Sequence, residues 1–276
     1  MALSISSVPE VLAQIGSARD VAFGSYFLPH GAMRDALVGA AQRGAHVAVT
    51  LQADPYRNPF GARCNAEAAR ALRAAGADVS LLPSDHAPFH LKAAVCDGVA
   101  YLDDRNWTKR GPEIVVADDA ARDVALVRDA LAGRGGGDSA LATRKDVALA
   151  REVRLVDQAR GAPVIVETER VATSPLTRAL QRHARAGAKT TLIVAPARHH
   201  SAREARAIAQ LAADGVVVRE GGSNQKLALA RGAAWIGSGN ATGASGRGAA
   251  QLEWGLLTRR RALVGAVAAA LAHDMR

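Results

Sequence analysis

The 276-residue chain has few cysteines and aromatic residues and no long apolar run. Its two cysteines, Cys64 and Cys96, are too few for a disulfide framework, and their spacing indicates no zinc site. An aromatic content of 4% argues against a surface that stacks single-stranded bases. No apolar stretch approaches the roughly 20 residues that span a bilayer. The sequence therefore predicts neither a disulfide-stapled domain nor a membrane-spanning one.

Acidic residues are also in deficit, with 26 Asp and Glu against 35 Lys and Arg, a formal charge of +9 at pH 7. This charge favours anionic partners such as phosphodiesters, nucleic acid or an anionic membrane surface. Arginine used simply on solvated faces would give the same charge, so the charge does not choose among these partners. The first residues lack the basic and apolar segments of a signal peptide, so we expect a cytoplasmic location.

Short apolar strands alternate with amphipathic helices along the chain. Residues 20–28, for example, have the alternation of a strand, and residues 32–43 have the periodicity of a helix. This order predicts an α/β fold with helices on both faces of the sheets.

A glycine-rich segment, Gly133–Gly137, predicts a boundary between two halves, residues 1–137 and residues 138–276. The stretch after it, residues 139–160, is rich in Ala, Leu, Arg and Glu and predicts a long helix. The second half then repeats the order of strands and helices found in the first.

The segment from His90 to Gly98 concentrates the residues that suggest chemistry. Its Asp97-Gly98 pair lies between apolar β-formers, which predicts a tight β-hairpin. His90 and Lys92 are two residues apart on the first strand, so both side chains leave the same face. Asn106 follows the returning strand and comes back toward His90. A nucleophile, a cation and an amide donor that meet in this way can hold and attack a phosphate.

The same hairpin occurs a second time, 134 residues later. Six positions match without a gap, which indicates an internal duplication. The matched pairs are His90/Asn224, Lys92/Lys226, Asp97/Arg231, Gly98/Gly232, Asp104/Ser238 and Asn106/Asn240. The copies differ at the first and third pairs, where histidine becomes asparagine and aspartate becomes arginine.

The two hairpins resemble the phospholipase D superfamily, whose mark is His-x-Lys-x4-Asp followed by a Gly-Ser-x-Asn-like segment. Residues 90–97 match the first part in full, residues 237–240 match the second, and residues 224–231 are a degenerate copy. The resemblance implies two repeated α/β halves with mixed sheets flanked by helices, an α-β-α sandwich. It implies a phosphodiesterase or phosphatidyltransferase that acts on a phosphodiester, in the first place a phospholipid, through a phosphohistidine without a metal or cofactor.

The resemblance also implies roles for individual residues. His90 would be the nucleophile, and an acidic residue beyond the motif would fix its tautomer, for which Glu113 is the candidate. The residues that would bind the phosphate are Lys92, Asn106, Lys226, Ser238 and Asn240. Asp97 would be a structural hydrogen-bonding residue, and the role of Glu253 stays open. The plain alternatives are a core histidine, solvated lysines, turn-capping asparagines and a surface glutamate.

Departures from the family pattern leave other functions open. Asn224 cannot transfer a proton in the working pH range, and loss of general acid–base help costs ~10²–10⁴-fold in rate. A good leaving group or a substitute acid, such as His199 or His200, would then be needed. Arg231 would bind phosphate or be solvated. The alternatives are therefore a nuclease of the same superfamily, or a pseudoenzyme that binds anionic phosphate groups, and the oligomeric state is undetermined.

Overall fold

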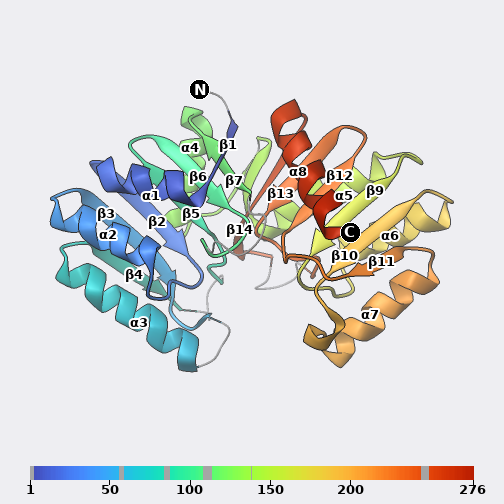
Figure 1. The fold of residues 1–276 in the computed structure, drawn as a ribbon, viewed down its shortest axis with the longest axis horizontal. Coiled ribbons are helices and arrows are strands. Elements are labelled where there is room, and N and C mark those ends of the chain that lie inside the picture. The colour runs from blue at the N-terminus through green and yellow to red at the C-terminus, as the bar shows by residue number, and fades with distance from the viewer. Residues whose placement is uncertain (1–2, 56–58, 84–87, 108–113, 138, 244–248) are drawn as a thin grey trace.

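The computed structural model describes residues 3–55, 59–83, 88–107, 114–137, 139–243 and 249–276. Two seven-stranded mixed sheets stand side by side, one built from each half of the chain (Figure 1). The expected α/β architecture with two repeated halves is confirmed.

The first half supplies the strands β1 (Ser4–Ser6), β2 (Asp20–Ser25), β3 (His46–Gln52), β4 (Asp78–Leu82), β5 (Ala93–Cys96), β6 (Val99–Asp103) and β7 (Val115–Asp118). Its helices are α1 (Val8–Ser17), α2 (Ala32–Gln42), α3 (Pro59–Ala74) and α4 (Ala121–Leu131). The strand order is β1-β7-β6-β5-β2-β3-β4, in which β2, β3 and β4 run parallel to one another.

The second half supplies the strands β8 (Leu141–Arg144), β9 (Val164–Thr168), β10 (Thr190–Val194), β11 (Val217–Glu220), β12 (Leu227–Ala230), β13 (Ala233–Gly237) and β14 (Leu252–Thr258). Its helices are α5 (Lys145–Asp157), α6 (Pro175–Arg185), α7 (Ala202–Ala213) and α8 (Arg261–Asp274), with a 3₁₀ turn at Ala197–His199. The order β8-β14-β13-β12-β9-β10-β11 reproduces the first sheet strand for strand. We propose that the halves meet between residues 137 and 138, in the segment that joins α4 to β8.

The prediction of one long helix over residues 139–160 is wrong at its beginning. Leu141–Arg144 forms the edge strand β8, and the helix α5 begins only at Lys145. β8 pairs with β14, more than a hundred residues further along the chain. A partner so distant in sequence leaves no trace in the local pattern, so the composition of the stretch suggested helix throughout.

Three buried clusters hold the layers together. Helices α1, α2 and α3 cover the outer face of the first sheet, and α5, α6 and α7 cover the outer face of the second. Between the sheets, α4 and α8 share one apolar core with strands of both halves. Burial of this shared core fixes the halves against each other and therefore fixes what their hairpins face.

Backbone contacts also cross between the halves. The N–H of His90 donates to the carbonyl of Leu252 at 2.9 Å, and the N–H of Leu252 donates to the carbonyl of Pro88 at 2.9 Å. The indole N–H of Trp254 donates to the carbonyl of Asp103 at 2.7 Å. These bonds join the segment that carries His90 directly to β14. Among the described residues, no helix has both the length and the apolar character needed to cross a membrane.

Candidate active site

The two predicted hairpins are present, and both turn at residues with positive φ. In the first, Asp97 and Gly98 have φ of 45° and 90°, and in the second Arg231 and Gly232 have φ of 47° and 66°. Positive φ at both central residues is what a two-residue hairpin turn of type I′ requires. The hairpins place His90 and Lys92 before β5, and Lys226 before β12, near the meeting line of the halves.

His90 lies between an acid and an amine. Its Nδ1 is 3.2 Å from Oε1 of Glu253, and Nζ of Lys92 lies 3.0 Å from Nδ1 and 2.9 Å from Nε2. Tyr26 packs edge-on against the imidazole, with ring centroids 4.8 Å apart. An ionised carboxylate only accepts, so Nδ1 carries the proton and Nε2 keeps its lone pair. In this tautomer the lone pair of Nε2 faces the amine of Lys92.

Burial and nearby charges set the protonation states in this cluster. Burial, followed by the charge of Lys92, lowers the pKa of His90 to about 4. Burial and the charge of Lys226 lower the pKa of Lys92 to about 7. Burial opposes ionisation of Glu253, but Lys145 and His90 outweigh it and lower its pKa to about 2. Near neutral pH the imidazole is therefore neutral and the carboxylate ionised.

Lys226 brings a second ammonium from the other half of the chain. Its Nζ donates to Oε2 of Glu169 at 3.1 Å and to the carbonyl of Asn224 at 2.7 Å. Lys92 repeats the second contact in its own half, donating to the carbonyl of His90 at 2.9 Å. The charge of Lys226 lowers the pKa of both His90 and Lys92.

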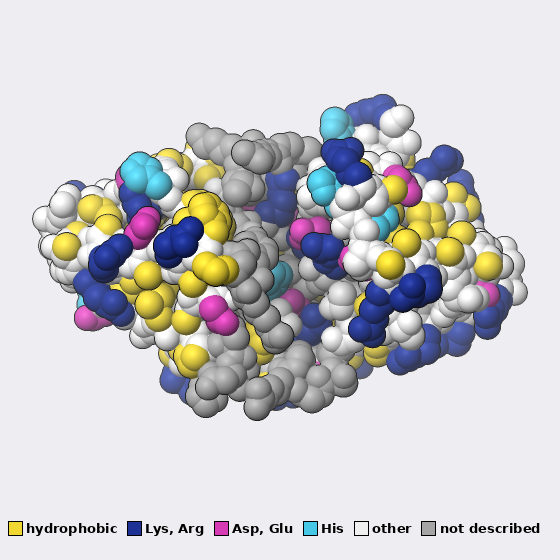
Figure 2. Space-filling model, turned by 90° about the horizontal axis from the view of Figure 1, so that it is seen from below, with side chains coloured by type: hydrophobic (Ala, Val, Ile, Leu, Met, Phe, Trp, Pro, Cys, Tyr) yellow, Lys and Arg dark blue, Asp and Glu magenta, His cyan; other side chains and the backbone are white. Residues whose placement is uncertain are grey.

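Glu253 is held in place from behind. Lys145 brings its Nζ to 3.7 Å from Oε1 of Glu253, and Gln251 donates its side-chain N–H to the same oxygen at 3.0 Å. Gly239 lies so close that a Cβ there would be 2.6 Å from Oε2 of Glu253. Glycine at this position of the Gly-Ser-Gly-Asn segment therefore gives the carboxylate its room. Seen from below, a hollow between the halves shows histidine, acidic and basic side chains together (Figure 2).

Comparison with known proteins bears on the family of one segment and on the fold of the whole chain. Residues 11–124 match a family described as cardiolipin synthase, PLD-like domain. The yeast tyrosyl-DNA phosphodiesterase has a similar structure, with a TM-score of 0.55 at 12% identity over 94% of this chain and 89% of that one. By sequence, residues 11–124 thus match a PLD-like domain, and the chain as a whole shares its fold with that phosphodiesterase.

Two further solved structures show the range of the likeness. A polyphosphate kinase from Porphyromonas gingivalis has a TM-score of 0.69 at 16% identity, over 98% of this chain and 48% of the kinase. The chain thus spans about half the length of that kinase. Nuc from Salmonella typhimurium, a phospholipase D family member, has a TM-score of 0.38 at 20% identity over 48% of this chain and 91% of that one. No curated protein matches the chain.

The remaining phosphate-binding candidates of the phospholipase D motif have other contacts. Ser238 is fully buried and its hydroxyl accepts from the N–H of Trp254 at 3.1 Å. The side-chain carbonyl of Asn240 accepts from the N–H of Arg170 at 3.1 Å. Asn106 is half-buried and lines a separate pocket of about 290 Å³ in the first half. In these contacts Ser238 supports β14, and Asn240 supports the loop after β9.

Asp97 and its counterpart Arg231 have different surroundings in the two copies of the motif. Asp97 accepts with its carboxylate from the N–H groups of Arg19 and Asp20, at 3.1 and 2.9 Å. Its counterpart Arg231 is exposed at the turn end of the second hairpin, away from Lys226. Asn224 is exposed, and its φ of 67° is left-handed. The degenerate copy of the phospholipase D motif has therefore changed in more than one side chain.

Some residues of the cluster were missed or left open by the sequence. Glu113, the expected partner of His90, lies outside the described residues, and the carboxylate found beside His90 is that of Glu253. Tyr26 and Glu169 were missed, although strand register places them at the same position of the two repeats. Their signal was that each is the first residue after a strand, β2 or β9, at the end where α/β sites form.

Asp104, at the position of the family's serine, is fully buried. Burial and the neighbouring Asp103 raise the pKa of Asp104 to about 7, which reduces its repulsion of a phosphate. Within the described ranges, no group of three or more His, Cys, Asp or Glu side chains is placed to hold a metal ion.

Proposed function

We propose that the protein is a phospholipase D-like phosphodiesterase or phosphatidyltransferase that forms a phosphohistidine at His90, with a phospholipid as the expected substrate. One observation carries the proposal: a buried, neutral imidazole has its Nδ1 3.2 Å from Glu253, while the amine of Lys92 lies within 3.0 Å of both ring nitrogens. The description of the matching family as a cardiolipin synthase supports phosphatidyl transfer in particular.

In the first step, a substrate phosphate replaces the imidazole as the partner of Lys92. Lys92 and Lys226 neutralise its non-bridging oxygens, and Nε2 of His90 attacks phosphorus. The P–N bond forms as the bond from phosphorus to the leaving oxygen breaks. Nδ1 keeps its proton, and the ionised Glu253 stabilises the positive charge that develops on the ring. Glu253 thus orients the nucleophile from the opposite half of the molecule.

In the second step, water or an alcohol attacks the phosphohistidine. Glu169 is the carboxylate beside Lys226. Although burial opposes its ionisation, the charge of Lys226 keeps the pKa of Glu169 below its usual value. It therefore accepts the proton of the attacking oxygen while the P–N bond breaks and Nε2 recovers its lone pair. An ionised Glu169 cannot protonate the leaving oxygen of the first step, so substrates with a good leaving group should react fastest.

Trapping the covalent intermediate tests this proposal. The protein is incubated with bis(p-nitrophenyl) phosphate and with labelled phosphatidylglycerol, then quenched in base and in acid. We expect a phosphoprotein that is stable in base and labile in acid, and that is absent from His90→Ala. His46→Ala, which removes an exposed histidine at the start of β3, serves as the matched control. Equal turnover by wild type and His90→Ala would remove His90 from the mechanism.

Two alternatives rest on specific observations. The positive charge of the chain favours a nuclease, whose binding to DNA should weaken steeply with added salt. The exposed, left-handed Asn224 favours a pseudoenzyme that kept the phosphate cradle without the second histidine. Binding of a phosphodiester without turnover, weakened by Lys226→Ala, would identify the pseudoenzyme.

A further inference from the structure

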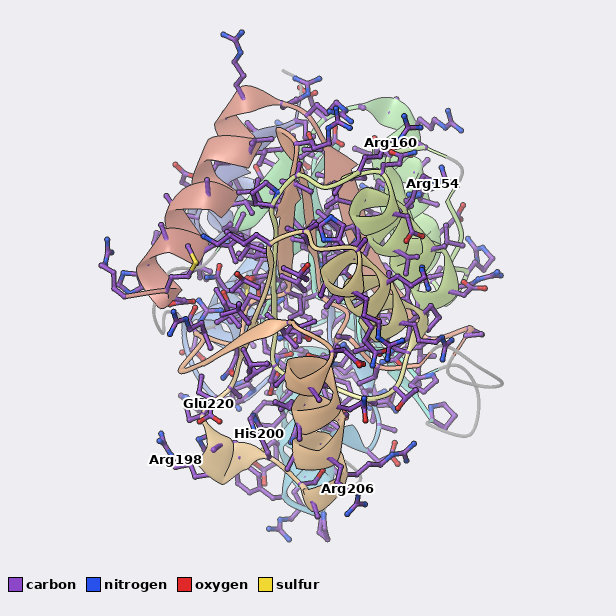
Figure 3. All side chains as sticks on the ribbon, turned by 90° about the vertical axis from the view of Figure 1, so that its right-hand side faces the viewer. Arg154, Arg160, Arg198, His200, Arg206 and Glu220 are labelled. Carbon is purple, nitrogen blue, oxygen red and sulfur yellow. The ribbon has the colours of Figure 1, made fainter. Side chains whose placement is uncertain are left out.

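A pocket lined by arginine lies at the far end of the second hairpin from the active site. The arginine pocket has a volume of about 360 Å³, and Arg160, Arg231 and Arg259 line it together with Gln158. The strand β12, with four residues, lies between Lys226 and Arg231, and the five steps from one to the other span about 16 Å at ~3.3 Å per residue. In Figure 3, Arg160 lies at the opposite end of the second half from Arg198 and Glu220. The pocket is therefore distinct from the hollow that holds His90.

The guanidinium groups of this pocket lack acidic partners. Arg160, Arg231 and Arg259 are exposed, and none of them forms an ion pair with a carboxylate of the described residues. The net charge of the chain is also unevenly divided. Residues 138–276 carry 21 Lys and Arg against 11 Asp and Glu, or +10, whereas residues 1–137 carry 14 against 15, or −1. The second half alone therefore has the charge to attract a polyanion.

The first half shows the structure of the corresponding hairpin end without an arginine pocket. In the first half, the position of Arg231 is occupied by Asp97, whose carboxylate accepts from the N–H groups of Arg19 and Asp20. The aspartate there satisfies two backbone donors at the start of β2. It is a local structural device and needs no ligand.

The second half has no equivalent of this bond between a turn carboxylate and the backbone. By strand register, the counterparts of the two donors are Ala162 and Pro163. Proline has no N–H, and the N–H of Ala162 already donates to the carbonyl of Ala159 at 3.0 Å. The second half therefore has no free backbone N–H at this place for a carboxylate to accept from. The replacement of aspartate by arginine at position 231 accompanies this change in the neighbouring backbone. The position was thereby freed for a side chain that faces solvent.

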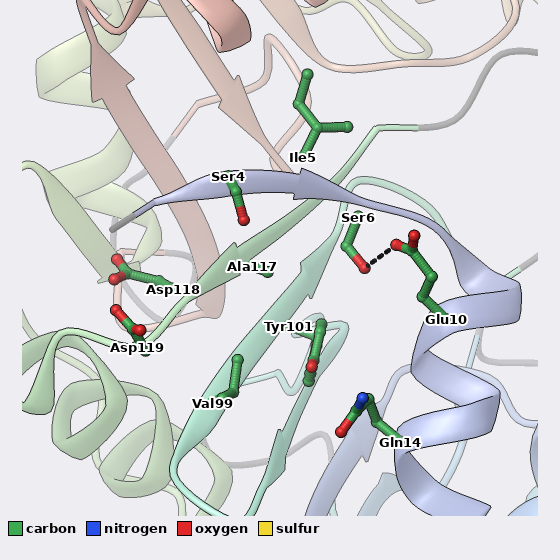
Figure 4. Close-up of a pocket in the computed structure, with 10 residues that line it drawn as sticks. All are labelled: Ser4, Ile5, Ser6, Glu10, Gln14, Val99, Tyr101, Ala117, Asp118 and Asp119. Atoms are coloured by element: carbon green, nitrogen blue, oxygen red, sulfur yellow. Dashed lines mark hydrogen bonds between the residues drawn. The ribbon is translucent and has the colours of Figure 1, made fainter. Parts of the chain in front are cut away.

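A second matched position reverses its charge in the same way. The register of β7 and β14 pairs Asp119 with Arg259. In the first half, Asp118 and Asp119 line an acidic pocket of about 430 Å³ together with Glu10 (Figure 4). One end of the duplicated unit is thus acidic in the first half and basic in the second.

The backbone gives an independent sign that these arginines serve more than the turn. Arg160 and Arg231 have φ of 45° and 47°, in the left-handed region that disfavours residues with a Cβ. Turn chemistry alone would select glycine, asparagine or aspartate at such positions. Two strained arginines around one pocket indicate that the guanidinium groups themselves are needed there.

We propose that the arginine pocket binds a compact oligophosphate anion, that is, two or more linked phosphate groups. Guanidinium groups form paired, charge-assisted hydrogen bonds with phosphate oxygens, and three of them suit several negative charges in a small volume. The site is a concave pocket at the end of a half. That shape favours a compact ligand over a flat bilayer or a long duplex.

Calorimetric titration of the full chain with inorganic tripolyphosphate tests the proposal. Lys226→Ala is titrated alongside, because the active site also attracts phosphate. We expect Lys226→Ala to keep one tripolyphosphate-binding event. The affinity of that event should fall roughly tenfold or more in Arg231→Gly and again in Arg259→Gln. Arg178→Gln, which removes an exposed arginine outside the pocket, should change little.

The variants also separate binding from folding and from turnover. Glycine adopts positive φ without strain, so Arg231→Gly should melt at the same or a higher temperature while binding the anion more weakly. Its turnover of bis(p-nitrophenyl) phosphate should equal that of wild type. Unchanged tripolyphosphate affinity in the double variant Arg231→Gly/Arg259→Gln would overturn the proposal. So would binding to anionic vesicles or to DNA, lost in the double variant, without binding of tripolyphosphate.

Discussion

At the scale of single residues, the protein holds opposite charges a few ångströms apart in a buried place. His90 and Lys92 both lose basicity there, while Glu253 stays ionised because Lys145 and His90 face it. A neutral imidazole beside an ammonium is the state that a nucleophilic attack on an anionic phosphate needs. The state exists only in a limited range of pH.

We therefore predict a bell-shaped pH dependence of kcat/KM on a phosphodiester. Activity should rise as His90 loses its proton through its pKa of about 4 and fall as Lys92 loses its proton through its pKa of about 7. In Lys92→Arg the charge persists at every pH, so the alkaline limb should move upward and the acidic limb should stay. An alkaline limb that stays near pH 7 in this variant would show that another group titrates there.

At the scale of elements, β14 and the segment after β13 determine the position of the carboxylate beside His90. Gly239 follows β13, and Glu253 lies on β14, so the distance between these two residues decides where the carboxylate lies. Among the described residues, a Cβ added at position 239 would clash with one atom, Oε2 of Glu253. That atom is the end of a flexible side chain, so it can move aside. A methyl group there is compatible with the fold but not with the present position of Glu253.

Gly239→Ala should thus leave the protein folded and lower its activity. With Oε2 of Glu253 2.6 Å from the added Cβ, the carboxylate must move away from Nδ1 of His90. Misplacement by about 1 Å can cost up to ~100-fold in rate. Single-turnover formation of the phosphoprotein should slow while the melting temperature changes little. Gly265→Ala, on α8 with open space around the added Cβ, is the control. A normal rate in Gly239→Ala would show that Glu253 does not position His90.

At the scale of the whole molecule, the halves share one core and cannot separate without exposing it. The shared cluster contains β5 and β6 side chains of the first half and β12, β13 and β14 side chains of the second. Bonds from the backbone of Leu252 to Pro88 and His90 extend the contact into the active site. The two sheets should accordingly unfold together.

Leu252→Ala should destabilise both halves at once. The side chain is 2% exposed within the shared cluster, and its loss should cost ~2–5 kcal/mol. Hydrogen exchange should show the same loss of protection in β2 and β9, one strand from each sheet. Leu211→Ala, in the outer cluster of the second half, gives the comparison for a local effect. Loss of protection in β9 alone after Leu252→Ala would contradict a common core.

The local pattern determined much of this protein. Turn chemistry at Asp97-Gly98, alternation in the strands and the repetition of the hairpin 134 residues later were all readable from neighbouring residues. They predicted the α/β fold and the duplication correctly, and they placed His90 and Lys92, whose side chains are in contact, on one face. Each of these features depends on residues close in sequence, or on a pattern that occurs twice.

Only the tertiary structure decided which groups face His90. Glu253 reaches it from the other half, and β8 joins its sheet through β14, so each depends on how two distant segments pack. The contacts of Ser238 with the backbone of Trp254 and of Asn240 with the backbone of Arg170 likewise join segments that are distant in sequence. The shared apolar core sets these relations, because it fixes two separately encoded halves in a single arrangement.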